Sequence, residues 1–110
     1  MSARARLPGK RPGVNVEIAT DGIAAICTVN VFQDGTPGEM FLDVGKPGST
    51  VDLISRDAAC LWSLAVQYGA PPDVLAHSLA RLEDGSPATI IGAASDLAVS
   101  AAAAYRAVSA

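Results

Sequence analysis

The residues with the clearest chemical potential form the run G-K-P-G-S-T at positions 45–50. A lysine, two glycines and two hydroxyl residues just before a helix can hold an anion, because the first amides of a helix have no partner within it. The run is not a P-loop, since Lys46 stands three positions before Ser49 and no glycine lies five residues upstream of Gly45. Two interpretations stay open: a capped strand-to-helix corner, which is favoured, and an anion or nucleotide contact. The second would use Lys46, Gly48, Ser49 and Thr50.

A second chemical feature is a basic N-terminal arm. Half of the eight basic residues of the chain fall within its first eleven positions, while the other 99 residues carry four basic and eleven acidic side chains. Such an arm could contact a nucleotide, a nucleic acid or an acidic partner, but no aromatic residue is interleaved, so nucleic acid is not favoured. The arm residues are Arg4, Arg6, Lys10 and Arg11.

The remaining reactive side chains do not form a catalytic pattern. His77 is the only histidine, and no nucleophile or metal ligand stands at a useful spacing from it. Cys27 and Cys60 fall at apolar positions without C-x-x-C spacing, so both are expected to be small buried side chains. An Asp52–Arg56 pair at i,i+4 is expected on a helix surface. We therefore predict no catalytic residue, no metal site and no cofactor.

Three strands are predicted to precede these helical segments. V-N-V-E-I from Val14 alternates apolar and polar residues, and an Asp-Gly pair at 21–22 is a strong hairpin signal. The second strand is expected over residues 23–32 and the third over 39–44, separated by Q-D-G-T-P-G. Short turns between successive strands favour an antiparallel meander.

Three helices are predicted to follow, at residues 49–68, 74–82 and 89–108. Ser49 or Thr50 is suited to cap the first helix, and Gly69 to end it. In that helix apolar residues recur at three- and four-residue spacing, which predicts a buried stripe. The stripe comprises Val51, Ile54, Ala58, Leu61, Ala65 and Tyr68. The second helix is expected to bury Val74, Leu75, Leu79 and Leu82, and the third is rich in alanine.

Together these elements predict an α+β fold of order βββααα, with a three-stranded antiparallel meander and three helices packed on one of its faces. The domains are the arm at 1–13 and a single α+β domain at 14–110. Because the flanks of the first helix are also apolar and the sheet leaves two edges, a homodimer is expected. The chain has no apolar run typical of a membrane span or a signal peptide, so a cytoplasmic location is expected.

Four sequence blocks together resemble the TSCPD domain, which lies in the C-terminal region of vitamin B12-dependent (class II) ribonucleotide reductases and also occurs in free-standing small proteins. These blocks are R-L-P-G-K-R-P-G at 6–13, D-G-T-P-G-E-M-F at 34–41, G-K-P-G-S-T at 45–50 and S-L-A-V-Q-Y-G-A-P at 63–71. The Thr-Ser-Cys-Pro-Asp segment that names the domain is absent, and residues 83–92 read E-D-G-S-P-A-T-I-I-G instead. Any role of that cysteine therefore does not transfer to this chain.

The resemblance implies an auxiliary domain associated with deoxyribonucleotide synthesis, acting as a binding or assembly module. It would be a free-standing protein that contacts a reductase chain or a nucleotide and is not catalytic alone, because the catalytic barrel of the reductase has no counterpart here. The alternative is a structural or regulatory homodimer that has kept the fold and lost its link to the reductase.

Overall fold

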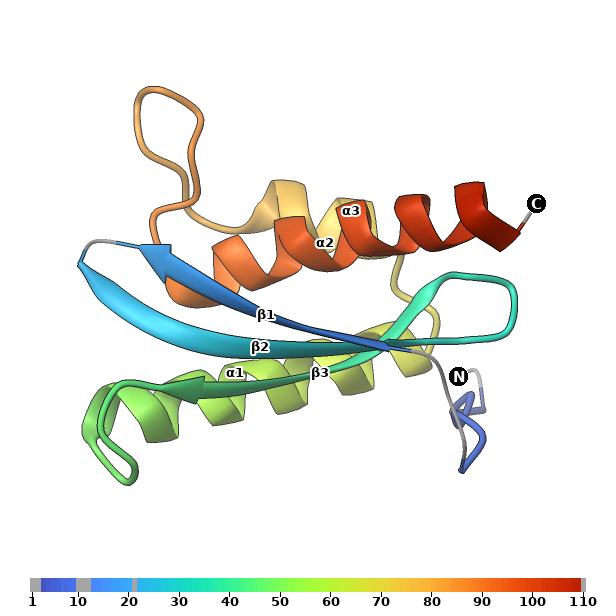
Figure 1. The fold of residues 1–110 in the computed structure, drawn as a ribbon, viewed down its shortest axis with the longest axis horizontal. Helices are drawn as coiled ribbons and strands as arrows, with labels where there is room; N and C mark the ends of the chain where they lie inside the picture. The colour runs from blue at the N-terminus through green and yellow to red at the C-terminus, as the bar shows by residue number, and fades with distance from the viewer. Residues whose placement is uncertain (1–2, 10–12, 21, 110) are drawn as a thin grey trace.

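The computed structural model describes residues 3–9, 13–20 and 22–109, and the side chains of these residues up to 103. The element order is β1 (Gly13–Thr20), β2 (Ile23–Val31), β3 (Pro37–Val44), α1 (Thr50–Gln67), α2 (Pro72–Ser78) and α3 (Ile90–Ser109). Figure 1 shows the strands as one twisted sheet with the helices alongside it. The predicted α+β fold and its βββααα order are confirmed.

The sheet is an antiparallel meander of order β1-β2-β3. Thr20 pairs with Ile23, so the first hairpin has a two-residue connection, and Gly22 in that connection has a φ of 73°. A type I′ turn needs positive φ there, which explains the glycine. The other turn residue, Asp21, lies outside the described residues.

The core lies between one face of the sheet and the helices. The strand residues that contribute to it alternate along β2 and β3, as expected for a half-buried sheet. They are Ala25, Cys27, Val29, Met40, Leu42 and Val44. Small residues of α3, Ala94 and Ala98, pack against them with no exposed surface. Trp62 of α1 fills the space between the two long helices and donates its indole N–H to Ser95 Oγ at 2.9 Å.

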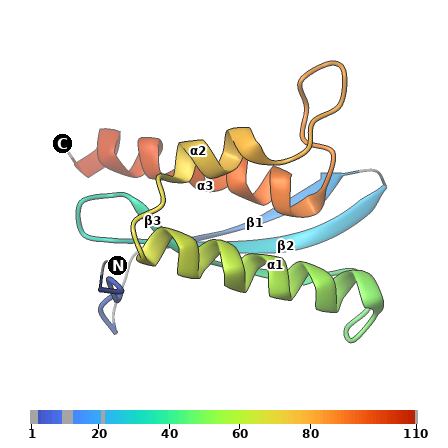
Figure 2. The same cartoon turned by 180° about the vertical axis from the view of Figure 1, so that it is seen from behind.

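The three helices cover different parts of this face. α1 runs beside β3, and α3 contacts all three strands and has α2 packed against it (Figure 2). Thr89 caps α3, because its Oγ1 accepts the amide of Gly92 at 3.1 Å. β1, at the other edge of the sheet, is less covered, and its inward-facing Val14 and Val16 remain 42% and 36% exposed.

The predicted buried face of α1 is wrong. The helix buries Asp52, Ser55, Ala59, Trp62, Ser63, Val66 and Gln67. The predicted stripe is turned outward instead, with Ile54 64%, Leu61 68% and Tyr68 47% exposed. The reason is the unpaired backbone edge of β3, to which α1 presents hydrogen-bonding side chains. Leaving buried backbone amides and carbonyls unpaired would cost more free energy than burying another leucine would contribute.

Two further burial predictions are also wrong. α2 ends at Ser78, earlier than predicted, and leaves Val74 and Leu82 54% and 57% exposed while burying Ala76. Cys60 is exposed, whereas Cys27 is fully buried as predicted. Hydrophobic periodicity predicts a buried Cys60, but this residue lies on the side of α1 that faces away from the core.

Candidate functional site

The 45–50 run forms a tight corner between β3 and α1. Gly45 and Gly48 have φ values of 56° and 79°, a conformation that favours glycine. Ser49 is the N-cap of α1, as predicted, and its Oγ accepts the amide of Asp52 at 3.3 Å. The side chains of Lys46 and Thr50 are exposed on this corner. The corner therefore is capped, and its lysine is accessible to solvent.

The Asp52 carboxylate lies on the inner side of this corner, where it is 1% exposed. It accepts the backbone amide of Val44 at 3.0 Å and that of Gly48 at 2.9 Å. These two hydrogen bonds, together with Arg56, hold the pKa of Asp52 below its ordinary value despite its burial. The Gly48 amide named for the anion site is thus bonded to a carboxylate of the chain itself. An anion contact by Lys46, Ser49 and Thr50 stays a prediction.

A cleft of about 440 Å³ opens beside this corner, between the outer edge of β3 and α1. Its volume lies within the range of small-molecule sites. Met40, Leu42 and Ala59 contribute apolar lining, and Phe41 and Cys60 add an aromatic ring and a thiol that are both accessible to solvent. The cleft therefore combines an apolar surface with one exposed aromatic side chain.

An arginine stands at each end of the cleft. Arg56 donates to Asp43 at 2.9 Å and pairs with Asp52 at 3.2 Å. Arg4, in the N-terminal arm, donates from Nε to Gln67 Oε1 at 2.6 Å. The two guanidinium groups are the cationic groups of the cleft lining, and an arginine is well suited to pair with a carboxylate or phosphate.

The described part of the basic arm docks on the end of α1. The amide of Ala5 donates to the carbonyl of Gln67 at 2.7 Å, next to the Arg4 contact. Arg6 is exposed and lines a shallower pocket with Glu39. Lys10 and Arg11 of the predicted arm lie outside the described residues. The arm is therefore in part an element of the cleft.

Little in the sequence predicts this cleft. The i,i+4 spacing predicts the Asp52–Arg56 pair, which is confirmed, but its predicted place on the helix surface is wrong for Asp52, which is buried. Two other contacts join residues that are farther apart in the chain: Arg56 with Asp43, and Arg4 with Gln67. No local pattern encodes such contacts.

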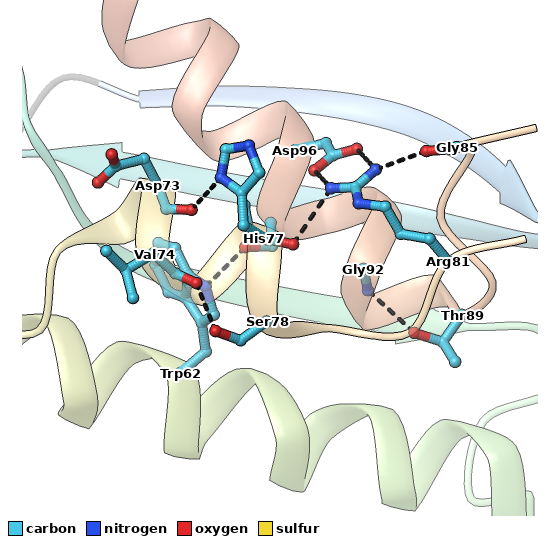
Figure 3. A network of polar contacts seen from close by, with 12 residues as sticks. Trp62, Asp73, Val74, His77, Ser78, Arg81, Gly85, Thr89, Gly92 and Asp96 are labelled. Carbon is cyan, nitrogen blue, oxygen red and sulfur yellow. Dashed lines mark hydrogen bonds and ion pairs between the residues drawn. The ribbon is translucent and has the colours of Figure 1, made fainter.

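A second polar cluster holds the loop after α2, where the Thr-Ser-Cys-Pro-Asp segment would be expected. Arg81 contacts both carboxylate oxygens of Asp96, at 2.6 and 3.0 Å, and donates to the carbonyls of Ala76 and Gly85 (Figure 3). The hydrogen bonds to Asp96 raise the pKa of Arg81. With its donors engaged in this way, Arg81 ties α2, the loop and α3 together. We interpret the cluster as structural.

In the part of the chain that the structure describes, the reactive groups do not converge on a catalytic arrangement. His77 is exposed, and its Nδ1 lies 2.7 Å from the carbonyl of Asp73 in its own helix. Burial raises the pKa of Cys27 to about 11, which keeps that thiol protonated and unreactive. Over the described residues, no three His, Cys, Asp or Glu side chains gather as metal ligands. The same residues include no helix long and apolar enough to cross a membrane.

Comparison with known proteins relates the chain to one class of enzyme. It is 34% identical over 78 residues to a vitamin B12-dependent ribonucleotide reductase of Rhodopirellula baltica, which covers 71% of this chain and 8% of the reductase. The reductase of Streptantibioticus cattleyicolor is 35% identical over 68 residues, covering 62% of this chain and 11% of that protein. The reductase of Bradyrhizobium diazoefficiens is 30% identical over 89 residues, covering 79% and 7%.

The chain is therefore related to a region of vitamin B12-dependent ribonucleotide reductases. It spans about a tenth or less of the length of these curated relatives. No protein-family model and no solved structure matches it.

Proposed function

We propose that this chain is a TSCPD-like auxiliary domain, a non-catalytic binding or assembly module associated with deoxyribonucleotide synthesis. The observation that carries the proposal is its 34% identity over 78 residues to a vitamin B12-dependent ribonucleotide reductase. A region this small, in whose described residues no nucleophile, base and oxyanion site converge, is suited to binding rather than to chemistry.

The ligand that fits the cleft best is a nucleotide, or another molecule with a flat ring and an anionic group. Phe41 is exposed in the lining and can stack on a ring, and Arg4 and Arg56 place guanidinium groups at the two ends, where Arg56 already pairs with Asp43 and Asp52. Aromatic stacking and arginine pairing are common devices for holding bases and phosphates. The corner formed by Lys46, Ser49 and Thr50 is the competing contact for the same class of ligand.

A thermal-shift series with ribonucleoside di- and triphosphates tests this binding. A ligand present at 100 times its dissociation constant adds about 2.7 kcal/mol to the free energy of unfolding. We expect at least one nucleotide to raise Tm by several degrees, and Arg56→Gln to remove most of that rise. Lys46→Ala is the matched cationic variant: if it alone removes the rise, the site is the corner. No rise with any nucleotide would exclude nucleotide binding.

Isolation of the tagged protein from its own cells tests the association with a reductase. We expect a ribonucleotide reductase chain to be recovered with it and identified by mass spectrometry. Recovery of neither a reductase nor a nucleotide would contradict the proposed function.

One observation favours a second candidate function. The outward stripe of α1 exposes large apolar side chains, which soluble monomers rarely do in a contiguous patch. A structural or regulatory homodimer without a reductase link would cover this surface. It would show no thermal shift with nucleotides and would still self-associate.

A further inference from the structure

One apolar surface of α1 is not explained by the fold, and we call it the α1 stripe. We define it as Val51, Ile54, Ala58, Leu61, Ala65 and Tyr68. Ile54 and Leu61 are 64% and 68% exposed, more than any other large apolar side chain described. Side chains of this kind are buried in most proteins, because each contributes about 1.5–3 kcal/mol when removed from water.

Two large side chains of the stripe are evenly spaced on either side of Leu61. Ile54 stands seven positions before it and Tyr68 seven after it, while Ala58 and Ala65 stand three before and four after. When two copies of α1 pack antiparallel with their Leu61 residues at a two-fold axis, Ile54 of one copy faces Tyr68 of the other. Seven-residue spacing is the repeat that keeps apolar positions along the seam of a helix pair. The two alanines permit the axes to approach to about 8 Å, the close end of the usual range.

We propose that the α1 stripe is the interface at which a second copy of this chain binds, with the two α1 helices antiparallel about Leu61. This deepens the second candidate function by naming its surface, and it stands independently of any nucleotide or reductase contact. A two-fold axis gives the same patch on both subunits, so a self-complementary pattern is what a homodimer requires.

The charges beside the stripe are compatible with this pairing. Asp57 is the charged residue that flanks Leu61 on the outer side of α1, and it is exposed. Four positions separate it from the two-fold axis, so the two Asp57 residues stand about 12 Å apart along the helices at 1.5 Å per residue. That exceeds the Debye length of about 8 Å at physiological salt, and their repulsion is therefore screened.

The area is sufficient for a weak dimer. A large aliphatic side chain has on the order of 100 Å² of apolar surface, and an aromatic one has about 200 Å². Multiplied by the exposed fractions of the stripe's side chains, these areas give on the order of 300 Å² of exposed apolar surface on each copy. Since interfaces are about 60% apolar, the total buried area is on the order of 1,000 Å², the lower limit for a specific interface. A groove lined by Val51, Ile54, Ile90 and Ile91 continues the apolar surface toward α3. We therefore expect a dissociation constant in the micromolar range.

Sedimentation equilibrium of the wild type and two charge variants tests the interface. Leu61→Glu places carboxylates at the two-fold axis and should weaken dimerisation at least tenfold. Leu53→Glu is the matched control, because Leu53 is 53% exposed on the same helix but lies off the stripe, and should change the dissociation constant less than twofold. A wild type that remains monomeric at about 100 µM, far above a micromolar dissociation constant, would overturn both the interface and the homodimer.

Cross-linking gives a second test that does not depend on destabilising the dimer. In a Cys60→Ser background, Leu61→Cys should form a disulfide-linked dimer under mild oxidation, because the two thiols meet at the axis, while Leu53→Cys should not. A wild-type dimer that persists in Leu61→Glu, with no cross-link at position 61, would place the interface elsewhere. That result overturns this inference and leaves the homodimer standing.

Discussion

The polarity of the two faces of α1 is the reverse of that in an ordinary surface helix, whose outer face is the polar one. The face against β3 is rich in polar side chains: Asp52 and Ser63 accept the amides of Val44 and Met40, and Gln67 donates to the carbonyl of Gly38. The outer face carries Ile54 and Leu61, largely exposed. α1 thus closes the hydrogen-bonding edge of β3 with its side chains, and its apolar stripe is left for another partner. The edge of β1 receives no such cover from α1.

The difference has a physical cause. A free strand edge presents unpaired amides and carbonyls and is prone to pair with other chains. Polar side chains at positions 52, 63 and 67 of the helix beside that edge satisfy such groups without a further strand. Among the described residues, every buried side-chain nitrogen and oxygen has a hydrogen-bond partner. An amphipathic pattern therefore identifies which residues share a face, but not which face is buried.

The largest expected difference in the free energy of unfolding is between truncating a large side chain in the core and truncating one on the outer face of α1. Met40 is 1% exposed in the core and Ile54 is 64% exposed on α1. Met40→Ala should lower the free energy of unfolding by about 2–5 kcal/mol, because it leaves a cavity. Ile54→Ala should change it by less than about 0.5 kcal/mol in the monomer. Urea unfolding at low protein concentration measures both, and equal losses would contradict the assignment of the two faces.

Replacing the carboxylate at the corner tests the polar face as a function of pH. Asp52→Asn keeps the size of the side chain but removes the charge that the Val44 and Gly48 amides and Arg56 stabilise, so Tm should fall at pH 7. Because the pKa of Asp52 is lowered in the folded protein, its contribution is fully present above the unfolded value of about 3.9 and is lost as the pH falls through the folded value. The gap in Tm between wild type and variant should stay constant from neutral pH to about pH 5 and narrow below about pH 4. A gap independent of pH would show that the charge is not responsible.

A smaller effect is expected from the hydroxyl that binds the middle of the β3 edge. Ser63 Oγ accepts the amide of Met40 at 2.9 Å and lies 2.8 Å from the carbonyl of Ala59, to which it donates. Ser63→Ala leaves the amide without its partner and should cost about 1–3 kcal/mol of unfolding free energy. Ser78→Ala is a matched control, since the Ser78 hydroxyl donates to a carbonyl of its own helix on the surface. If both variants lose the same unfolding free energy, the hydrogen bond from the Met40 amide to Ser63 contributes no more to stability than a surface hydroxyl does.

The smallest effect on stability is expected from labelling Cys60, because its thiol is exposed and lies outside the core. Cys60 is exposed and Cys27 is fully buried, with its pKa raised by burial to about 11. A thiol reagent should therefore label Cys60 in the native protein and Cys27 only after unfolding. Peptide mapping after brief labelling distinguishes the two. Rapid native labelling of Cys27 would contradict its place in the core.

The strands, the order of the elements and the corner could be predicted because their signals are local. The Asp-Gly hairpin, the alternation along β1 and the Ser49 cap each depend on residues within a few positions of one another. Which face of α1 is buried could not be predicted, because this depends on the open edge of β3, and no pattern within the helix indicates that edge. The early end of α2 has a similar origin, since Arg81 ties the following loop to Asp96 in a distant helix.

The candidate site was predictable only in part. Ser49, Lys46 and the Asp52–Arg56 spacing are visible in the sequence, whereas the cleft depends on Arg4 reaching Gln67 across the fold. Helical spacing predicts Asp52 on the helix surface, whereas its carboxylate is buried, because its partners are backbone amides that the sequence does not mark.

Amide hydrogen exchange at the edge of β3 measures whether the side chains of α1 close that edge. The amides of Met40 and Val44 donate to the side chains of Ser63 and Asp52. Both should exchange far more slowly than amides of an open strand edge, and Ser63→Ala should accelerate Met40 selectively while Val44 stays protected. Exchange of both amides at the rate of unstructured peptides would show that α1 does not close this edge, and the account of its two faces would fail.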